Sequence, residues 1–244
     1  MPKSTRRRTF ARLLAWVILL IGIPISLLAL TWLLTLPDVS VLATANPGPT
    51  ALMEHRQEMS RAEHRQTPRR WSWVPLARIS PHLQHAVIAA EDASFFIHEG
   101  FDWEGIKDAA IHNLEAGEMK RGGSTITQQL AKNLYLSSER SMLRKAREAL
   151  ITRSLEHHLT KERILELYLN VAEWGNGVYG AEAAARHHFA KSAQELTQEE
   201  AAWLAAILPS PRRYDPLRKT TSLTKRHLRI LRSMNKIPTI SSGR

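Results

Sequence analysis

The helical interpretation of this chain starts from one stretch, Ala89-Ala90-Glu91-Asp92-Ala93-Ser94-Phe95-Phe96-Ile97-His98-Glu99-Gly100. Two adjacent carboxylates follow an apolar run, and two aromatic residues and a histidine come after them. An ionised carboxylate in apolar surroundings is costly unless it is used, and burial that raises a carboxylate's pKa produces a general acid or base. The stretch therefore makes Glu91 the candidate catalytic group of an enzyme.

Helix signals continue on both sides of this stretch. Ser80-Pro81 predicts the N-cap and first turn of a helix that ends at Glu91. Ser124 is expected to cap another helix, whose apolar residues recur at helical spacing. We expect further helices over residues 102–117, 140–159, from 160 onward, 180–190, 197–208 and 222–234, the last with Leu228, Leu231 and Met234 on its apolar face. Strong strand alternation is missing, so the predicted fold class is mainly α with at most a small hairpin.

An apolar segment near the N-terminus predicts a membrane anchor. No charged residue occurs from Leu13 to Leu36, and this is enough apolar chain for one transmembrane helix. Basic residues precede it, so the N-terminus is expected in the cytoplasm and the rest of the chain outside it. The alternative is a signal peptide cleaved near Ala43-Thr44-Ala45, which the length of the apolar segment disfavours.

Composition sets the domain organisation and narrows the function. The chain has 244 residues, 43% of them hydrophobic, no cysteine and a formal net charge of +11. Lack of cysteine excludes disulfides and thiolate metal sites. A basic chain suggests nucleic acid, but an exported domain argues against that partner. We expect a basic cytoplasmic tail, a transmembrane helix, a juxtamembrane linker, a catalytic domain and a C-terminal tail, at 1–12, 13–36, 37–70, 71–235 and 236–244.

Two patterns indicate an anion site. A glycine turn precedes a helix at Lys120-Arg121-Gly122-Gly123-Ser124-Thr125, and helix N-termini attract anions. Arg140, Arg144 and Glu148 share one helix face, which Lys132 can join, and guanidiniums suit phosphate. The alternatives are a plain glycine turn and a solvated, salt-bridged face. The adjacent histidine pairs lack metal-ligand spacing. A carboxylate base beside such a cation cluster, on a membrane tether, fits glycosyl transfer from a lipid-linked sugar diphosphate.

At these residues the sequence resembles the bacterial peptidoglycan glycosyltransferases, the family that includes the glycosyltransferase domain of class A penicillin-binding proteins. Five motifs carry the resemblance in order: Glu91-Asp92-x-x-Phe95-x-x-His98-x-Gly100, Gly123-Ser124-Thr125-Ile126-Thr127-Gln128-Gln129-Leu130, Arg144-Lys145-x-x-Glu148, Lys161-x-x-Ile164-Leu165-Glu166-x-Tyr168-Leu169-Asn170, and Gly177-x-x-Gly180 with Phe189. One departure stands out, because His188-Phe189-Ala190 replaces the usual Tyr-Phe-Gly. No transpeptidase domain is expected.

The resemblance implies a lysozyme-like helical fold and polymerisation of lipid II, with inversion and release of undecaprenyl pyrophosphate, at the bacterial inner membrane. Glu91 would be the base that takes the proton of the acceptor 4-hydroxyl. Glu148 would organise a pyrophosphate site made by Lys132, Arg140 and Arg144. The other substrate-side residues that the motifs imply are Asp92, Phe95, His98, Ser124, Gln128, Gln129, Asn133 and Lys145. Glu166 and Asn170 are expected to be structural.

No cofactor is obligatory in this interpretation, although magnesium or manganese assists the leaving group in some members of the family. The expected partners are lipid II, the growing lipid-linked glycan, the membrane, and the proteins of cell-wall elongation or division. Two alternatives stay open from sequence: a lytic enzyme that cleaves existing glycan, which would need a paired carboxylate, and a non-catalytic scaffold of cell-wall synthesis.

Overall fold

The computed structural model of the protein describes residues 10, 16, 18–65, 67–116, 123–137, 139 and 141–235. Most of the predicted basic tail, residues 120–122 of the glycine turn, Arg140 and the tail 236–244 lie outside the described residues. The chain forms two compact units, Met1–Asp38 and Val39–Arg244.

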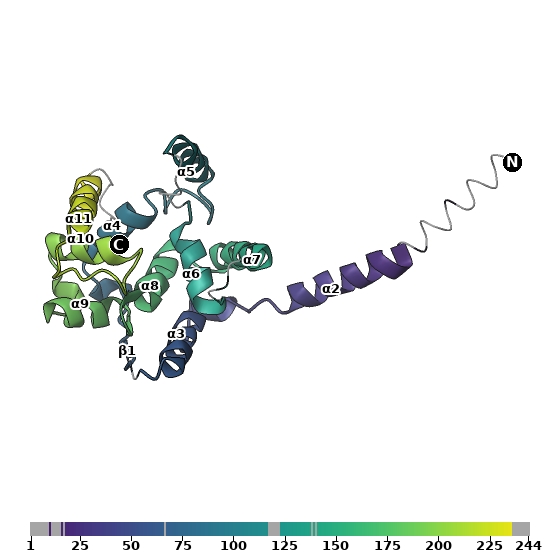
Figure 1. The fold of residues 1–244 in the computed structure, drawn as a ribbon, viewed down its shortest axis with the longest axis horizontal. Coiled ribbons are helices and arrows are strands. Elements are labelled where there is room, and N and C mark those ends of the chain that lie inside the picture. Colours follow the sequence, from purple (N-terminus) through teal and green to yellow (C-terminus); the bar gives the residue numbers. More distant parts are fainter. Residues whose placement is uncertain are drawn as a thin grey trace. The chain divides into compact units, whose positions relative to one another are not determined.

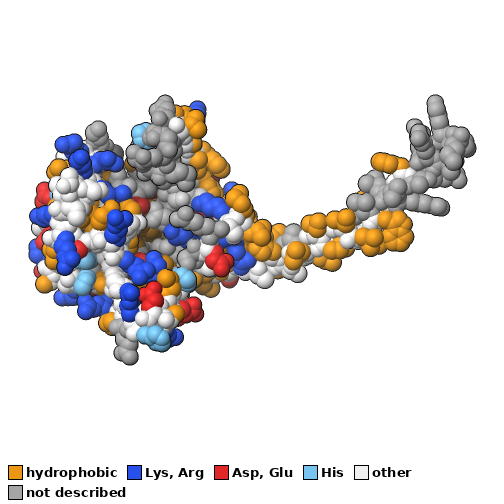
Figure 2. Space-filling model, viewed as in Figure 1, with side chains coloured by type: hydrophobic (Ala, Val, Ile, Leu, Met, Phe, Trp, Pro, Cys, Tyr) orange, Lys and Arg blue, Asp and Glu red, His pale blue; other side chains and the backbone are white. Residues whose placement is uncertain are grey.

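The first unit contains a π-helical turn, η1 (Ile18–Gly22), and the helix α2 (Ile23–Leu34). Its large apolar side chains are exposed, with Leu28 at 71% and Leu34 at 74%, and Figure 2 shows apolar side chains along this helix. Within the described ranges, no helix combines the length and the apolarity needed to cross a membrane. The transmembrane helix therefore stays a prediction.

The second unit is mainly helical, which confirms the predicted class. Its larger helices are α3 (Ala51–Ala62), α4 (Pro81–Glu91), α5 (Trp103–Ala116), α6 (Ile126–Tyr135), α7 (Met142–His158), α8 (Lys161–Val171), α9 (Ala181–Phe189), α10 (Gln198–Ile207) and α11 (Thr221–Met234). Short turns of 3-10 helix occur at η2 (Ser40–Ala43), η3 (Leu76–Arg78) and η4 (Ala193–Glu195).

A small sheet accompanies the helices. The strands β2 (Glu173–Gly175) and β3 (Val178–Tyr179) form the hairpin that the sequence allowed. The strand β1 (Arg70–Trp71) pairs with β3 in parallel, giving the order β1-β3-β2. Gly177 (φ 72°) makes the hairpin turn, where an added Cβ would lie 2.7 Å from the Pro68 carbonyl oxygen. Only glycine fits this close approach.

Two helical layers share the core (Figure 1). The helices α4, α10 and α11 pack on one another, and α6 packs on α3, α7 and α8. The interior position of α10 explains its composition, since all residues from Ala201 to Ile207 are buried. Asn170 is fully buried on α8 and exchanges hydrogen bonds with the Val74 backbone, at 2.9 Å in each direction. Its predicted structural role is confirmed.

Two local expectations were wrong, whereas the bounds of α7 are close to those expected. The N-cap of α6 is Thr125, which forms a capping box with Gln128, and Ser124 precedes it. The helix α7 begins at Met142 behind the N-cap Ser141. Leu228 is 45% exposed, because the buried face of α11 is formed by Leu223, His227, Ile230 and Met234. For α11, a small rotation about the helix axis decides which side chains face inward.

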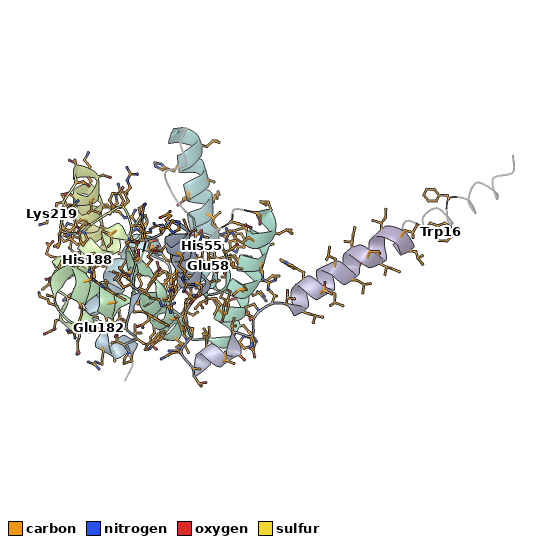
Figure 3. All side chains as sticks on the ribbon, turned by 60° about the horizontal axis from the view of Figure 1, so that its bottom comes forward. Trp16, His55, Glu58, Glu182, His188 and Lys219 are labelled. Carbon is orange, nitrogen blue, oxygen red and sulfur yellow. The ribbon has the colours of Figure 1, made fainter. Side chains whose placement is uncertain are left out.

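The departure at the end of α9 has a defined geometry. His188 (Figure 3) contacts the Trp174 carbonyl oxygen through Nε2 at 2.8 Å, so this nitrogen is the protonated donor. Burial lowers the pKa of His188, an effect that the Trp174 carbonyl opposes. Ala190 ends the helix in the left-handed conformation, at φ 55°. Glycine would adopt that conformation without strain.

Candidate active site

Glu91 is the last residue of α4, and its side chain is 13% exposed. Each carboxylate oxygen has one described donor. Gln129 of α6 donates from Nε2 to Oε2 at 2.9 Å, and Arg226 of α11 donates from Nη2 to Oε1 at 3.0 Å. The sequence suggested apolar surroundings for Glu91. In the structure, each of its carboxylate oxygens instead has a polar contact.

Tyr168 fixes the orientation of the Gln129 amide. The phenol of Tyr168, on α8, donates to Gln129 Oε1 at 3.0 Å, which leaves Gln129 Nε2 facing Glu91. Burial raises the pKa of Tyr168 well above its usual value, and the carboxylates of Glu91 and Asp92 raise it further. The phenol therefore keeps its proton and can donate to Gln129. Through Tyr168, Gln129 and Arg226, the helices α8, α6 and α11 hold the Glu91 carboxylate.

The side chain of Asp92 is buried and contacts the loop after α4 and the start of α6. Its Oδ1 contacts His98 Nε2 at 2.8 Å, and its Oδ2 accepts from the Ile126 amide at 2.9 Å. The second contact is at the first residue of α6, where backbone amides lack intrahelical partners. His98 Nδ1 accepts from the Gly100 amide at 3.1 Å, so the pair orders the loop after α4.

Phe95, another predicted substrate-side residue, is fully buried. The Lys161 ammonium lies 4.7 Å from the centre of its ring, within the range of a cation–π interaction. The buried Phe95 ring therefore helps to hold the loop that follows α4 in place. Its direct contact with substrate stays a prediction, as do those of Asp92 and His98.

A cluster of charges lies at the far end of α6 and on α7. Glu148 is 3% exposed and contacts Arg144 Nη1 at 2.8 Å and the Lys145 ammonium. These pairs confirm that Arg144 and Glu148 share a face of the helix. Among the described residues, none accepts a hydrogen bond from the buried Nε atom of Arg144. A buried donor without an acceptor is costly.

Lys132 belongs to the same cluster. Part of its side chain reaches solvent, yet burial of the ammonium lowers the pKa of Lys132, and Arg144 and Lys145 lower it further while Glu148 opposes them. Gln129 and Lys132 are three residues apart on α6, and residues at this spacing are neighbours on a helix surface. The helix α6 therefore connects the Glu91 carboxylate to the cation cluster.

The remaining predicted residues differ in their positions. Gln128 is buried, and its Oε1 accepts a hydrogen bond from the Thr125 amide at 3.0 Å, in the capping box of α6. Asn133 is buried on the same helix, and Ser124 is exposed just before it. Arg140 lies outside the described residues. The roles of these side chains toward substrate stay predictions.

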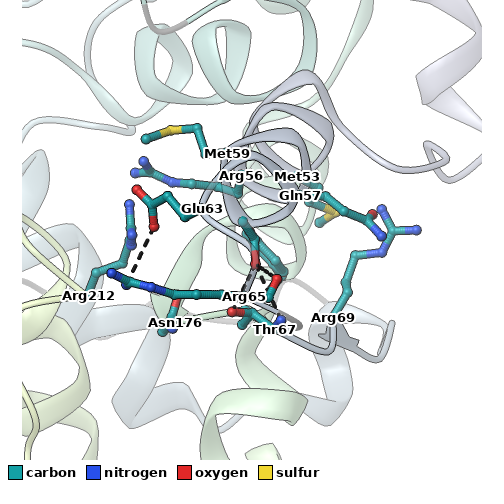
Figure 4. Close-up of a pocket in the computed structure, with 13 residues that line it drawn as sticks. Met53, Arg56, Gln57, Met59, Glu63, Arg65, Thr67, Arg69, Asn176 and Arg212 are labelled. Carbon is teal, nitrogen blue, oxygen red and sulfur yellow. Dashed lines mark hydrogen bonds and ion pairs between the residues drawn. The ribbon is translucent and has the colours of Figure 1, made fainter.

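A separate narrow cavity of about 30 Å³ lies beside α3 (Figure 4). Its lining includes Arg56, Arg65, Arg69 and Arg212. Arg56 is engaged by the buried Glu173, with Nε and Nη2 at 3.1 and 3.0 Å from Oε2. Burial raises the pKa of Glu173, and Arg56 opposes that effect. The volume suffices for a water molecule, so this cavity is distinct from the substrate-sized surface that Glu91 requires.

Two candidate functional residues were not predicted from the sequence. Arg226 lies on α11, far from Glu91 in sequence, and Tyr168 stood only in a motif. The one signal for Arg226 was the basic amphipathic pattern of residues 222–234. That pattern gives no indication of which cation turns inward.

Comparisons with known proteins identify the family of the chain. The chain matches the family model described as Transglycosylase over residues 55–235. It is 45% identical over 224 residues to the biosynthetic peptidoglycan transglycosylase of Janthinobacterium sp. (strain Marseille), covering 92% of this chain and 96% of the relative. The proteins of the same description from Nitrosospira multiformis and Bordetella pertussis are 52% and 48% identical, over 78% and 97% of this chain and 82% and 99% of theirs.

The family model and the relatives' descriptions define the chain as an enzyme that transfers glycosyl groups. The chain belongs to the transglycosylase family, whose model matches about three quarters of it. The resemblance seen in the five motifs is thereby confirmed.

Proposed function

We propose that Glu91 is the base of a reaction that extends peptidoglycan strands from lipid II. The chain is a peptidoglycan glycosyltransferase of cell-wall synthesis, as its family and its relatives' descriptions indicate. The observation that carries the proposal is the spacing on α6, where Gln129 binds the Glu91 carboxylate and Lys132, one turn later, joins the cation cluster.

The proposed chemistry uses the two groups that α6 connects, the Glu91 carboxylate and the cation cluster. The Glu91 carboxylate takes the proton of the acceptor 4-hydroxyl, and that oxygen attacks the anomeric carbon of the lipid-linked donor with inversion. The bond from this carbon to the pyrophosphate oxygen breaks, and the lipid pyrophosphate leaves. Lys132, Arg144 and Lys145 stabilise its negative charge.

A resident divalent cation does not fit this donor set. Both oxygens of Glu148 already contact cationic side chains, and the described residues contain no group of three His, Cys, Asp or Glu side chains that could hold a metal. The proposed mechanism therefore uses no metal step.

Hydrolysis of existing glycan is the competing reaction. A hydrolase normally uses two carboxylates that flank the scissile bond. Asp92 is the neighbouring carboxylate, but its side chain is only 1% exposed, against 13% for Glu91, and it is held by His98 and the Ile126 amide. The cation cluster also has no role in hydrolysis, so transfer is favoured.

One comparison separates the two reactions. The full chain in detergent is incubated with labelled lipid II and, separately, with purified sacculi. We expect glycan polymer on a gel from lipid II and no soluble muropeptides from sacculi. Muropeptide release without polymer would assign the protein to lysis instead.

We further propose that residues 13–36 anchor the enzyme in the bacterial inner membrane, with residue 1 in the cytoplasm. The support is the uncharged sequence of this segment and the exposure of its apolar side chains from Ile18 to Leu34. A reporter that functions only outside the cytoplasm should be active when it is fused after Arg244. A reporter that functions only in the cytoplasm should be inactive at the same position. Activity confined to the cytoplasm would reverse the proposed topology. Contacts with elongation or division proteins stay predictions.

A further inference from the structure

The chain that follows the apolar segment is built into the catalytic unit. Val39 and Leu42 are 1% and 3% exposed, so both side chains belong to its core. The compact unit begins at Val39, and Leu42 lies in the helical turn η2. Residues 37–70, expected as a linker, therefore contain buried and helical structure from their start.

Arg163 of α8 fastens this segment with polar contacts. Its Nε donates to the Leu42 carbonyl at 2.8 Å, and its Nη2 donates to the Ala45 carbonyl at 2.8 Å and to Asn46 Oδ1 at 2.9 Å. Three contacts from one guanidinium fix both the position and the direction of residues 42–46. Lysine cannot reproduce them, because its ammonium is a point charge on a flexible stem.

Other contacts hold the Arg163 guanidinium itself in place. Its Nη1 pairs with Glu166 one turn along α8, and Glu166 also accepts from the Leu76 amide at 2.8 Å. The guanidinium carbon lies 5.6 Å from the centre of the Trp73 ring. The Arg163 side chain is only 16% exposed. These contacts make the guanidinium a rigid attachment point rather than a mobile surface charge.

The attachment shortens the tether between anchor and enzyme. A flexible linker over residues 37–70 would let its ends separate by about 30 Å on average. With Val39 fixed, only Pro37 and Asp38 lie between the apolar segment and the unit, a span of at most about 11 Å. Local concentration falls steeply as a tether lengthens, so a shorter tether raises the local concentration of the enzyme for a substrate in the same membrane.

We propose that Val39, Leu42 and Arg163 form a clamp that fixes the start of the catalytic unit, so that only Pro37 and Asp38 tether this unit to the proposed membrane anchor. This proposal rests on the proposed function, since the reacting pyrophosphate of a lipid-linked donor lies at the bilayer surface. Arg163 is then a positioning residue, which acts through residues 42–46 and touches no substrate. The clamp thereby limits the length of flexible chain that joins the catalytic unit to the apolar segment.

Two insertions of the same flexible sequence test the clamp in the full chain. A 24-residue Gly-Ser segment is placed either between Asp38 and Val39, before the clamp, or between Gly48 and Pro49, after it. An added Cβ at Gly48 would meet no atom within 4 Å, so this second site has room. Polymerisation is measured with lipid II in the same proteoliposomes and with a short-chain, water-soluble lipid II analogue.

The clamp predicts unequal effects. The insertion before Val39 should lower the rate on bilayer lipid II by about tenfold, from the loss of local concentration, and leave the rate on the soluble analogue unchanged. The insertion after Gly48 should leave both rates within about twofold. Equal bilayer rates for the two insertions would overturn the clamp. Absence of polymer from both substrates with the unmodified chain would contradict the proposed function, and the clamp's role with it.

A pair of conservative variants tests the polar part of the clamp. Arg163→Lys should lower the bilayer rate at least threefold while sparing the soluble analogue, because the charge remains and the fork of contacts is lost. Arg153→Lys, on the exposed face of α7, should change neither rate. A fall of both rates with Arg163→Lys, together with a lower melting temperature, would show that Arg163 only stabilises the fold and would refute its positioning role.

Discussion

Arg226 Nη2 lies 3.0 Å from Glu91 Oε1 and joins α11 to the end of α4 across 135 residues of chain. The guanidinium is one third exposed and the carboxylate is largely buried. Since Gln129 binds the other oxygen, the position of the Glu91 carboxylate depends on α4, α6 and α11 together. The candidate base is therefore held in place only when these three helices pack together.

Arg226→Ala should lower kcat for lipid II polymerisation by at least tenfold, because small displacements of a reacting group are costly in rate. KM should change little, since Arg226 holds the base rather than the pyrophosphate. Steady-state kinetics on lipid II will separate the two parameters. The matched control is Arg229→Ala, an exposed position on the same helix. Equal kcat values for the two variants would refute this role for Arg226.

Lys132 predicts a pH dependence at the alkaline side. Burial lowers the pKa of Lys132 below that of a solvent-exposed lysine, with help from Arg144 and Lys145. As pH rises through this lowered pKa, the ammonium becomes neutral and its attraction for pyrophosphate is lost, so activity should fall. Arginine stays charged throughout this range. Lys132→Arg should thus move the alkaline limb of kcat/KM to higher pH.

The profile is measured from pH 7 to 10, with each variant normalised to its own maximum. Lys107→Arg, at an exposed position of α5, controls for general effects of replacing a lysine. An alkaline limb that coincides in Lys132→Arg and the unmodified chain would show that Lys132 does not set it.

Ala190 predicts a gain in stability. This residue ends α9 at φ 55°, a conformation that costs a non-glycine residue about 1 kcal/mol or more. Ala190→Gly should raise the free energy of unfolding by about 0.5–1 kcal/mol, since the greater freedom of glycine in the unfolded chain offsets part of the gain. Denaturant unfolding measures the difference.

Ala183→Gly, inside the same helix, is the matched control and should lower the free energy of unfolding by up to about 1 kcal/mol. If both glycine substitutions destabilise the protein alike, the left-handed conformation of Ala190 carries no strain.

Part of the site could be predicted from sequence because it depends on local periodicity. A helix that ends at Glu91 and a face shared by Arg144 and Glu148 both follow from the 3.6-residue repeat, and the structure has both. The fold class follows from the same signals. Chain-local patterns thus give the elements and the residues that each element carries.

The remainder depends on how helices rotate against their neighbours. Gln128 and Gln129 are adjacent in sequence, yet one caps its own helix and the other binds Glu91. The pairing of Arg226 with Glu91 arises where α11 packs on α4. Phe95 reads as a motif residue but is buried. Such tertiary contacts leave no signal in the periodicity of either partner.

The most direct test of the account replaces the carboxylate of Glu91 alone. Glu91→Gln removes the proton acceptor and keeps the shape of the side chain, whereas Glu99→Gln makes the same change at an exposed position of the following loop. Both full-length variants are assayed for initial rates of polymer formation from labelled lipid II. The account predicts at least about a 100-fold loss for Glu91→Gln and no loss for Glu99→Gln. A Glu91→Gln variant that polymerises lipid II at the unmodified rate would contradict it.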